Sequence, residues 1–225
     1  AQPIRDAITQ MVDKSDLGYL GSIPEMGSSF AGFAKRRWHW EVEPSYVRIA
    51  TDVGVAVVEL LRVFANPGDK VLISSPVYQN FYTWIRETKV EMIDVPFKPD
   101  ASANDGTGWS HDWDGIEQAY QSGIKVHLLC NPHNPLGKVY SKEDLLRITG
   151  LAKKNNVIVI SDEIHAPLTF KEQPFTPFLS LGSDAAEVGI AVTAASKGWN
   201  IAGLKCAIIV SQNETINAHL ASMPM

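Results

Sequence analysis

The sequence has few cysteines and no spacing of residues that is typical of a metal site. Its 225 residues include two cysteines, Cys130 and Cys206, and both lie inside apolar runs. This pattern predicts core thiols in a reducing compartment, so we expect a cytoplasmic protein without a bound metal. The chain also lacks a GxGxxG segment and a Walker-type GK[ST] segment, which disfavours NAD and ATP as ligands.

Long apolar runs and a strong excess of one charge are missing as well. No stretch is long enough to cross a membrane, and the start of the chain does not resemble a signal peptide. A net charge of −5 is not typical of a protein that binds nucleic acid. The chain begins without an initiator Met and ends within a regular pattern, so we expect it to be part of a longer protein. We expect a small molecule as its partner, rather than a membrane or a nucleic acid.

Strand-like runs alternate with helical patterns along the whole chain. Most of these runs are apolar on both faces, as in strands that helices cover on both sides. The alternation predicts an α/β protein with three αβα layers and a mainly parallel seven-stranded sheet. The predicted strands are 46–51, 70–75, 90–95, 125–130, 157–162, 189–194 and 205–210, and the predicted helices are 55–65, 80–89, 113–123 and 141–155.

Three local features refine this prediction. Only about ten residues separate 189–194 from 205–210, whereas a parallel crossover needs a dozen or more, so 205–210 is predicted to be the one antiparallel strand. Ser141 and Asp144 form a capping-box pattern at the start of the last helix. The polar segment 98–110 is predicted to be a surface loop.

Candidate ligand-binding residues follow the strands at their carboxyl ends, where open α/β sheets bind their ligands. Val53, Gly54 and Val55 open a helix directly after the first strand, and their N–H groups would suit an anion such as phosphate. Tyr78 follows the second strand and could stack on a planar ligand. Each signal is weak alone, because glycine turns are common and a buried aromatic residue usually belongs to the core.

An amide, an acid and a lysine follow three further strands. Asn134 lies in NPHNPLG, whose Asn-Pro pairs are typical of a tight turn. Asp162 ends the strand 157–162, where an unpaired buried charge is costly. Lys197 follows the strand 189–194, although a lone lysine in a loop is usually a solvated surface residue. Together with the phosphate cradle and the aromatic ring, these groups match pyridoxal 5′-phosphate (PLP), which needs a lysine, an acid facing its pyridine nitrogen and an anion site.

The same segments resemble those of a known family. NPHNPLG, SDEIH and SKGWNIAGLK resemble, in order and spacing, signature segments of the fold-type I PLP enzymes, the aminotransferase class I/II superfamily. RRWHWEVEPSYVRIATDVGV and NIAGL are similar to the cystathionine β-lyase, or C–S lyase, branch. The resemblance covers essentially the whole chain. It implies that residues 1–225 form the PLP-binding large domain, with an N-terminal arm or loop at 1–29, and that a C-terminal small domain lies outside this chain.

The resemblance also implies a role for each candidate residue. Lys197 would bind the cofactor covalently and move the Cα proton of the substrate, and Asp162 would pair with the protonated pyridine nitrogen. Asn134 would hydrogen-bond the phenolic oxygen, and Tyr78 would stack on the ring. We expect these side chains and His165 to line one cleft, with Lys197 partly desolvated. The phosphate would be bound by backbone donors of Val53, Gly54 and Val55 and by hydroxyls of Thr193 and Ser196.

Three positions depart from the pattern of the family. His165 stands where many relatives carry a Tyr, and its charge near neutral pH is open. Lys205 stands where aminotransferases usually carry an Arg that clamps the phosphate, and a lysine is a point charge rather than a fork. Asp52 would repel a phosphate unless its side chain points away or caps the helix.

The resemblance further implies a homodimer, and it includes two X–Pro bonds. We expect Tyr19, in the segment 15–27, to reach the phosphate of the neighbouring subunit; a solvent-facing loop is the alternative. We expect Ser75–Pro76 or Asn134–Pro135 to be cis, which is uncommon among X–Pro bonds.

The leading functional hypothesis is a PLP-dependent C–S lyase of amino-acid metabolism, with methionine biosynthesis as its expected context. It would cleave cystathionine or a related cysteine conjugate to a thiol, pyruvate and ammonia. An aminotransferase of class I/II is the alternative, because the large domain alone does not separate the two reactions. A third hypothesis is a regulator that keeps a PLP-type domain as a ligand sensor without turnover.

Overall fold

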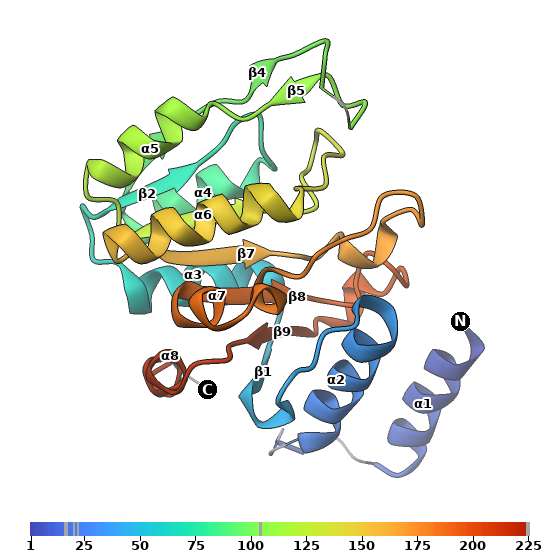
Figure 1. The fold of residues 1–225 in the computed structure, drawn as a ribbon. Helices are drawn as coiled ribbons and strands as arrows, with labels where there is room; N and C mark the ends of the chain where they lie inside the picture. The colour runs from blue at the N-terminus through green and yellow to red at the C-terminus, as the bar shows by residue number, and fades with distance from the viewer. Residues whose placement is uncertain (16–17, 20, 22, 104, 224–225) are drawn as a thin grey trace.

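A seven-stranded mixed sheet forms the centre of the molecule (Figure 1). The computed structural model describes residues 1–15, 18–19, 21, 23–103 and 105–223. The strand order is β1-β9-β8-β7-β6-β2-β3, and only β9 runs antiparallel to its two neighbours, as predicted. The strands are β1 (Val47–Ala50), β2 (Lys70–Ile73), β3 (Glu91–Asp94), β6 (Val126–Cys130), β7 (Ile158–Asp162), β8 (Gly189–Thr193) and β9 (Ala207–Val210).

Helices cover both faces of this sheet, which confirms the three αβα layers. One face packs against α2 (Pro24–Trp38), α5 (Trp113–Gln121), α6 (Lys142–Asn155) and α7 (Ser183–Val188). The other packs against α3 (Val53–Phe64), α4 (Asn80–Thr88) and α8 (Glu214–Leu220). Short 3₁₀ turns cover Pro44–Tyr46, Ala166–Leu168, Phe178–Leu181 and Ala202–Leu204. No helix within the described residues has both the length and the apolar character needed to span a bilayer.

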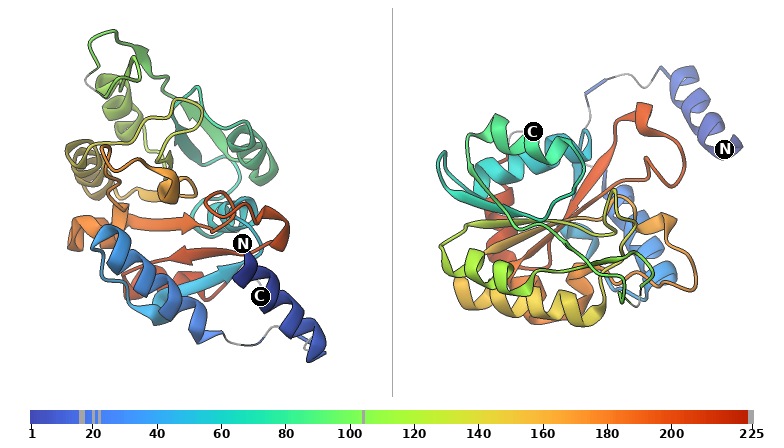
Figure 2. Two further views of the ribbon diagram at one scale, coloured as in Figure 1. Left: turned by 90° about the vertical axis from the view of Figure 1, so that its right-hand side faces the viewer. Right: turned by 90° about the horizontal axis from the view of Figure 1, so that it is seen from above.

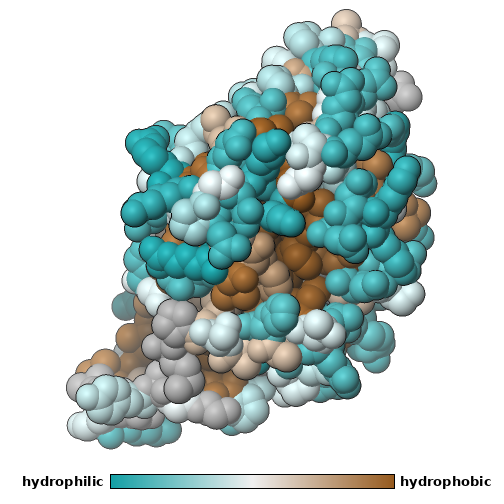
Figure 3. Space-filling view, turned by 90° about the vertical axis from the view of Figure 1, so that its left-hand side faces the viewer, coloured by the Kyte–Doolittle hydropathy of each residue, from teal (hydrophilic) through white to brown (hydrophobic). Residues whose placement is uncertain are grey.

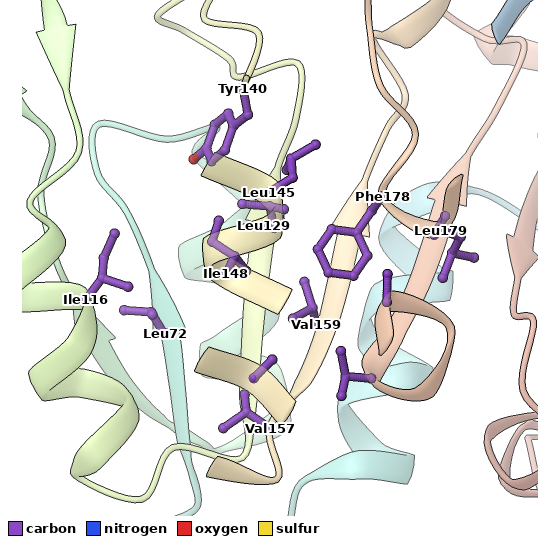
Figure 4. Packing of buried hydrophobic residues seen from close by; sticks show 14 of the residues in the cluster. Leu72, Ile116, Leu129, Tyr140, Leu145, Ile148, Val157, Val159, Phe178 and Leu179 are labelled. Atoms are coloured by element: carbon purple, nitrogen blue, oxygen red, sulfur yellow. The ribbon is translucent and has the colours of Figure 1, made fainter. Parts of the chain in front are cut away.

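The core divides into two apolar layers because successive side chains of a strand point to opposite faces. On β7, Val159 belongs to the layer under α5, α6 and α7, whereas Ile160 belongs to the layer over α3 and α4. Figure 4 shows the first layer, where Leu145 and Ile148 of α6 meet Leu129 of β6. Burial of each such side chain stabilises the folded state by roughly 1.5–3 kcal/mol.

The helix starts follow the local sequence signals. Ser141 Oγ accepts a hydrogen bond from the Asp144 N–H (3.0 Å), and Asp144 Oδ2 accepts one from the Ser141 N–H (3.3 Å). This reciprocal pair is the predicted capping box at the start of α6. It fixes the direction in which α6 leaves the loop that carries Asn134.

Two segments contain more regular structure than the sequence predicted. Within 98–110, β4 (Lys98–Pro99) and β5 (Trp109–Ser110) form a small antiparallel sheet, so this segment is not a plain loop. Its polar residues make a turn, and the ion pair between Asp105 and Lys138 connects that turn to the body of the protein. Within 1–29, α1 (Gln2–Asp13) precedes α2 and contains no buried residue.

The two ends of the parallel strands present different surfaces. Figure 3 shows the amino ends, where hydrophilic residues surround a hollowed apolar area. The left view of Figure 2 faces the carboxyl ends, and the right view shows α1 apart from the rest of the fold. The candidate residues singled out above gather at the carboxyl ends.

Gly189, the first residue of β8, generates a prediction on stability. A Cβ at this position would lie 2.6 Å from the Ala185 carbonyl oxygen and 2.6 Å from Phe178 Cε1. We expect Gly189→Ala to lower the free energy of unfolding by about 1–3 kcal/mol, because the buried neighbours would have to move. Urea unfolding of the two proteins measures the change.

Gly150 provides the matched control. It lies inside α6, and a Cβ there would have no neighbour within 4 Å. Gly150→Ala should raise the stability by up to about 1 kcal/mol, because alanine favours a helix over glycine. Equal effects of the two substitutions would contradict the close packing at Gly189.

Candidate active site

The carboxyl ends of β6, β7 and β8 bring the predicted residues together. Asp162, the last residue of β7, lies opposite Cys130 of β6 and Val192 of β8 in the sheet register. The loops that follow β6 and β8 carry Asn134 and Lys197. With the first turn of α3, they enclose a cavity of about 250 Å³. Its lining comprises Asp52, Val53, Gly54, Tyr78, Asn80, Trp84, Cys130, Asn134, Asp162, Ile164, His165, Ser196, Lys197, Ala202 and Lys205.

Most of the predicted residues line this cavity, but three do not. The Thr193 hydroxyl donates to the Glu163 carbonyl oxygen (3.1 Å), and Thr193 faces a neighbouring apolar cavity. The Val55 N–H donates to Asp52 Oδ1 (2.9 Å), so this backbone donor is already used inside the protein. Tyr19 is fully exposed and lies outside the cavity lining.

Lys197 lies in the cavity wall, but it is more accessible than expected. The prediction was a partly desolvated side chain, whereas Lys197 is exposed. The loop after β8 forms the rim of the cavity, and the residues that follow Lys197 are exposed as well. Its ammonium group therefore meets both solvent and the cavity.

Asp162 is the buried charge at the bottom of the site. The residue is only 5% exposed. Its Oδ1 accepts one hydrogen bond, from the Ile164 N–H (3.1 Å). Burial raises the pKa of Asp162 to about 7, against the opposing effects of that hydrogen bond and of the Lys197 charge. A cationic ligand next to this carboxyl would hold it ionised.

Glu163, which follows Asp162 in the sequence, has a different environment. Its Oε1 accepts hydrogen bonds from the Phe178 N–H (2.9 Å) and from the Ser161 hydroxyl (3.1 Å). Burial raises its pKa to about 8, and the neighbouring Asp162 adds to the shift. Of the two acids in SDEIH, only Asp162 lines the cavity.

Asp52 and Lys205 form an ion pair at the start of α3. Asp52 caps the helix through its Oδ1, and its Oδ2 lies 3.0 Å from Lys205 Nζ. Although partial burial raises the pKa of Asp52, the hydrogen bond from Val55 and the Lys205 cation together lower it. The Asp52 carboxylate thus caps the helix, and the Lys205 cation neutralises it. A helix cap is one arrangement in which Asp52 would not repel a phosphate.

Two neighbours hold the ring of Tyr78. Asn80 Nδ2 donates to the Tyr78 hydroxyl (3.0 Å). The Trp84 ring meets the Tyr78 ring edge to face, with centroids 6.2 Å apart and an angle of 67°.

The bonds Ser75–Pro76 and Asn134–Pro135 are both cis, as predicted for at least one of them, and Asn131–Pro132 is cis as well.

His165 carries no charge at neutral pH in this environment. Burial and then the Lys197 charge lower its pKa below the usual 6.5, against a hydrogen bond with the Pro132 carbonyl that raises it. A neutral imidazole can donate one hydrogen bond and accept another. The question that the sequence left open is therefore answered in favour of the neutral form.

Sequence reasoning missed several residues of the cavity, above all Trp84 and Cys130. Cys130 Sγ accepts a hydrogen bond from the Asn134 N–H (3.4 Å), and burial raises the pKa of the thiol far above its ordinary value. This cysteine therefore supports the Asn134 loop and is not a reactive thiol. Trp84 has the helical spacing of a core residue. No local pattern in the sequence distinguishes a tryptophan that lines a cavity from one that is buried in the core.

The burial of Asp162 predicts how stability depends on pH. With a pKa near 7 in the folded protein and 3.8 as the ordinary value, the folded state holds a proton that the unfolded state has lost. The Asp162 contribution to stability is therefore complete below pH 3.8 and is lost as the pH rises to 7. We expect Asp162→Asn to remove this loss, so that the variant gains about 2 kcal/mol relative to the ligand-free parent between pH 5 and pH 8.

Urea unfolding of both proteins at several pH values measures this difference. Asp114→Asn, at an exposed position on α5, is the control and should show no comparable change. A difference between Asp162→Asn and the parent that does not vary with pH would mean that Asp162 is ionised throughout this range.

Comparisons with known proteins agree with this geometry. The family model "Aminotransferase class I and II" matches residues 4–224. A Mycobacterium tuberculosis protein that is provisionally named a cystathionine beta-lyase is 36% identical over 98% of this chain and 54% of its own length. Cystathionine beta-lyase PatB of Bacillus subtilis is 31% identical over 93% of this chain and 53% of its own length. The chain thus spans about half the length of the curated relatives it matches.

Solved structures show the same relationship. Cystalysin from Treponema denticola, described as containing a pyridoxal 5′-phosphate cofactor, has a TM-score of 0.89 and 29% identity, over 97% of this chain and 56% of that one. The cofactor expected from the sequence is therefore the one found among the neighbours of this fold. The match over nearly the entire sequence shows that the chain belongs to the aminotransferase class I and II family.

Proposed function

We propose that this chain is the PLP-binding part of a C–S lyase, which cleaves cystathionine or a related cysteine conjugate. The observation that carries the proposal is the buried carboxyl of Asp162, which shares a cavity with Lys197 and the N-terminus of α3. The names of several relatives, cystathionine beta-lyases, support the choice of reaction.

The residues of the cavity fit the chemical groups of PLP. Among the residues that the structure describes, no cation contacts Asp162 directly. Its pKa is raised to about 7, and a protonated pyridine nitrogen would stabilise its ionised form. The first turn of α3 and Lys205 suit a phosphate. Tyr78 offers a ring face, and the amide of Asn134 and the neutral His165 suit a phenolic oxygen.

In this proposal, each protein group has a defined task. PLP, when bound, supplies the electron sink that stabilises negative charge at the substrate Cα. Lys197 Nζ would take the proton from the substrate Cα. The bond between Cβ and sulfur then breaks, the electron pair leaves with sulfur, and the thiolate takes up a proton. Water completes the balance, because the three-carbon remainder is hydrolysed to pyruvate and ammonia.

An aminotransferase is the second candidate, and the family name supports it. The two reactions share the removal of the Cα proton, so Lys197 and Asp162 would serve both. Lys205 stands where a transaminase usually has an arginine clamp, which favours the lyase. An amino acceptor is needed only by the transaminase.

The quaternary and domain structure belong to the same proposal. We propose that residues 1–225 form the large domain of a homodimer, in which Tyr19 reaches the site of the partner. The fully exposed Tyr19 and an α1 helix without buried residues support this arrangement. We expect the natural full-length protein to have twice its monomer mass in light scattering, and a monomer would contradict the proposal.

The central prediction concerns Lys197. The natural full-length protein should bind PLP with visible absorbance and convert L-cystathionine to a thiol, pyruvate and ammonia without an amino acceptor. Lys197→Ala should remove that absorbance and lower turnover by at least about 10²–10⁴-fold, because the proton acceptor is gone. Lys154→Ala, on the exposed surface of α6, is the matched control and should leave both unchanged.

Three results would contradict the proposed lyase. Dependence of cystathionine consumption on a 2-oxo acid would indicate an aminotransferase. PLP binding without turnover of any cysteine conjugate would indicate a ligand sensor. Full activity of Lys197→Ala would remove the basis for the PLP assignment.

A further inference from the structure

Trp84 presents its indole N–H beside the first turn of α3. The residue lies on α4, is 9% exposed and contributes to the cavity wall. The position that a Cβ would occupy on Gly54 lies 3.1 Å from Trp84 Nε1 and 3.3 Å from Trp84 Cζ2. The N–H edge of the indole therefore packs against the second residue of α3.

This N–H forms no hydrogen bond with any residue that the structure describes. The Asp52 carboxylate also lies next to Gly54, and its two oxygens bind the Val55 N–H and Lys205 Nζ. The nitrogen keeps some accessible surface, because it is not one of the fully buried polar atoms that lack a partner. Trp84 is thus an unpaired donor in the wall of a cavity that is built to receive a ligand.

The surroundings of the indole determine which ligand group suits it. The N–H groups of Val53 and Gly54 in the first turn of α3 and the Lys205 ammonium are also donors, and the helix end adds a partial positive charge. Asp52, the acceptor among them, is already engaged by the helix cap and the ion pair. A phosphate monoester, with several acceptor oxygens and two negative charges, matches this set.

We propose that the Trp84 indole donates a hydrogen bond to the cofactor phosphate. The inference rests on the proposed function, since the phosphate is that of PLP. Trp84 would supply the directional donor that Lys205 lacks as a point charge. Gly54 is needed at its position, because any side chain there would fill the narrow space between α3 and the indole.

The test compares the natural full-length protein with Trp84→Phe, which removes the N–H and keeps an aromatic ring. The dissociation constants of PLP and of pyridoxal, which lacks the phosphate, are measured by absorbance on the apoprotein. We expect Trp84→Phe to weaken PLP about 10-fold or more, as for a hydrogen bond to a charged group, and to leave pyridoxal unchanged. Inorganic phosphate should compete with PLP more strongly in the parent than in the variant.

Trp113→Phe is the matched control. Trp113 lies on α5, under the Arg147 guanidinium at 4.4 Å, and lies outside the cavity lining. This variant should bind both ligands as the parent does. Gly54→Ala provides a second route to the same result, since its Cβ would displace the indole and should also weaken PLP selectively.

Each remaining outcome overturns the inference. An unchanged affinity of Trp84→Phe for PLP would show that the N–H does not reach the phosphate. Equal losses for PLP and pyridoxal would show that Trp84 acts only by holding the Tyr78 ring. A parent protein that binds neither PLP nor pyridoxal would overturn the proposed function itself. If the parent binds PLP and Trp84→Phe binds it equally well, only the role of Trp84 is overturned.

Discussion

The burial of one carboxyl group at the end of a central strand is the constraint on which the site depends. Asp162 closes β7, and β6 and β8 flank it in register. An ionised carboxyl in such a place is costly unless a cation accompanies it, and its pKa near 7 reflects that cost. The surrounding loops are arranged so that a ligand can bring the missing charge.

The two apolar layers stabilise the sheet, whereas the polar candidate residues lie at the carboxyl ends of its strands. Aliphatic and aromatic side chains fill both faces of the sheet, so the strands hold a fixed register. The three loops after β6, β7 and β8 therefore start from fixed points. Support near the site continues this rigidity. Cys130 holds the Asn134 backbone, and Glu163 holds the Phe178 backbone on the opposite face.

The part of the cavity at the start of α3 has a different electrostatic arrangement. A carboxylate next to a phosphate would be unfavourable, but Asp52 is engaged by the α3 cap and by Lys205. The ion pair keeps the lysine next to the helix start, where its charge adds to that of the helix end. Trp84 of α4 lines the same cavity, so residues that are distant in sequence converge on one small volume.

Local patterns in the sequence determined the strands, the main helices and the candidate residues at the strand ends. These features follow from the spacing of residues along the chain, as the Ser141 capping box and the single antiparallel strand illustrate. Only the tertiary structure decided which donors and acceptors meet. Asp52 and Lys205 pair across 153 positions, Thr193 turns to Glu163, and the Trp84 indole faces Gly54. These partners depend on how helices pack on the sheet, and the period of a single helix or strand carries no information about its neighbour's side chains.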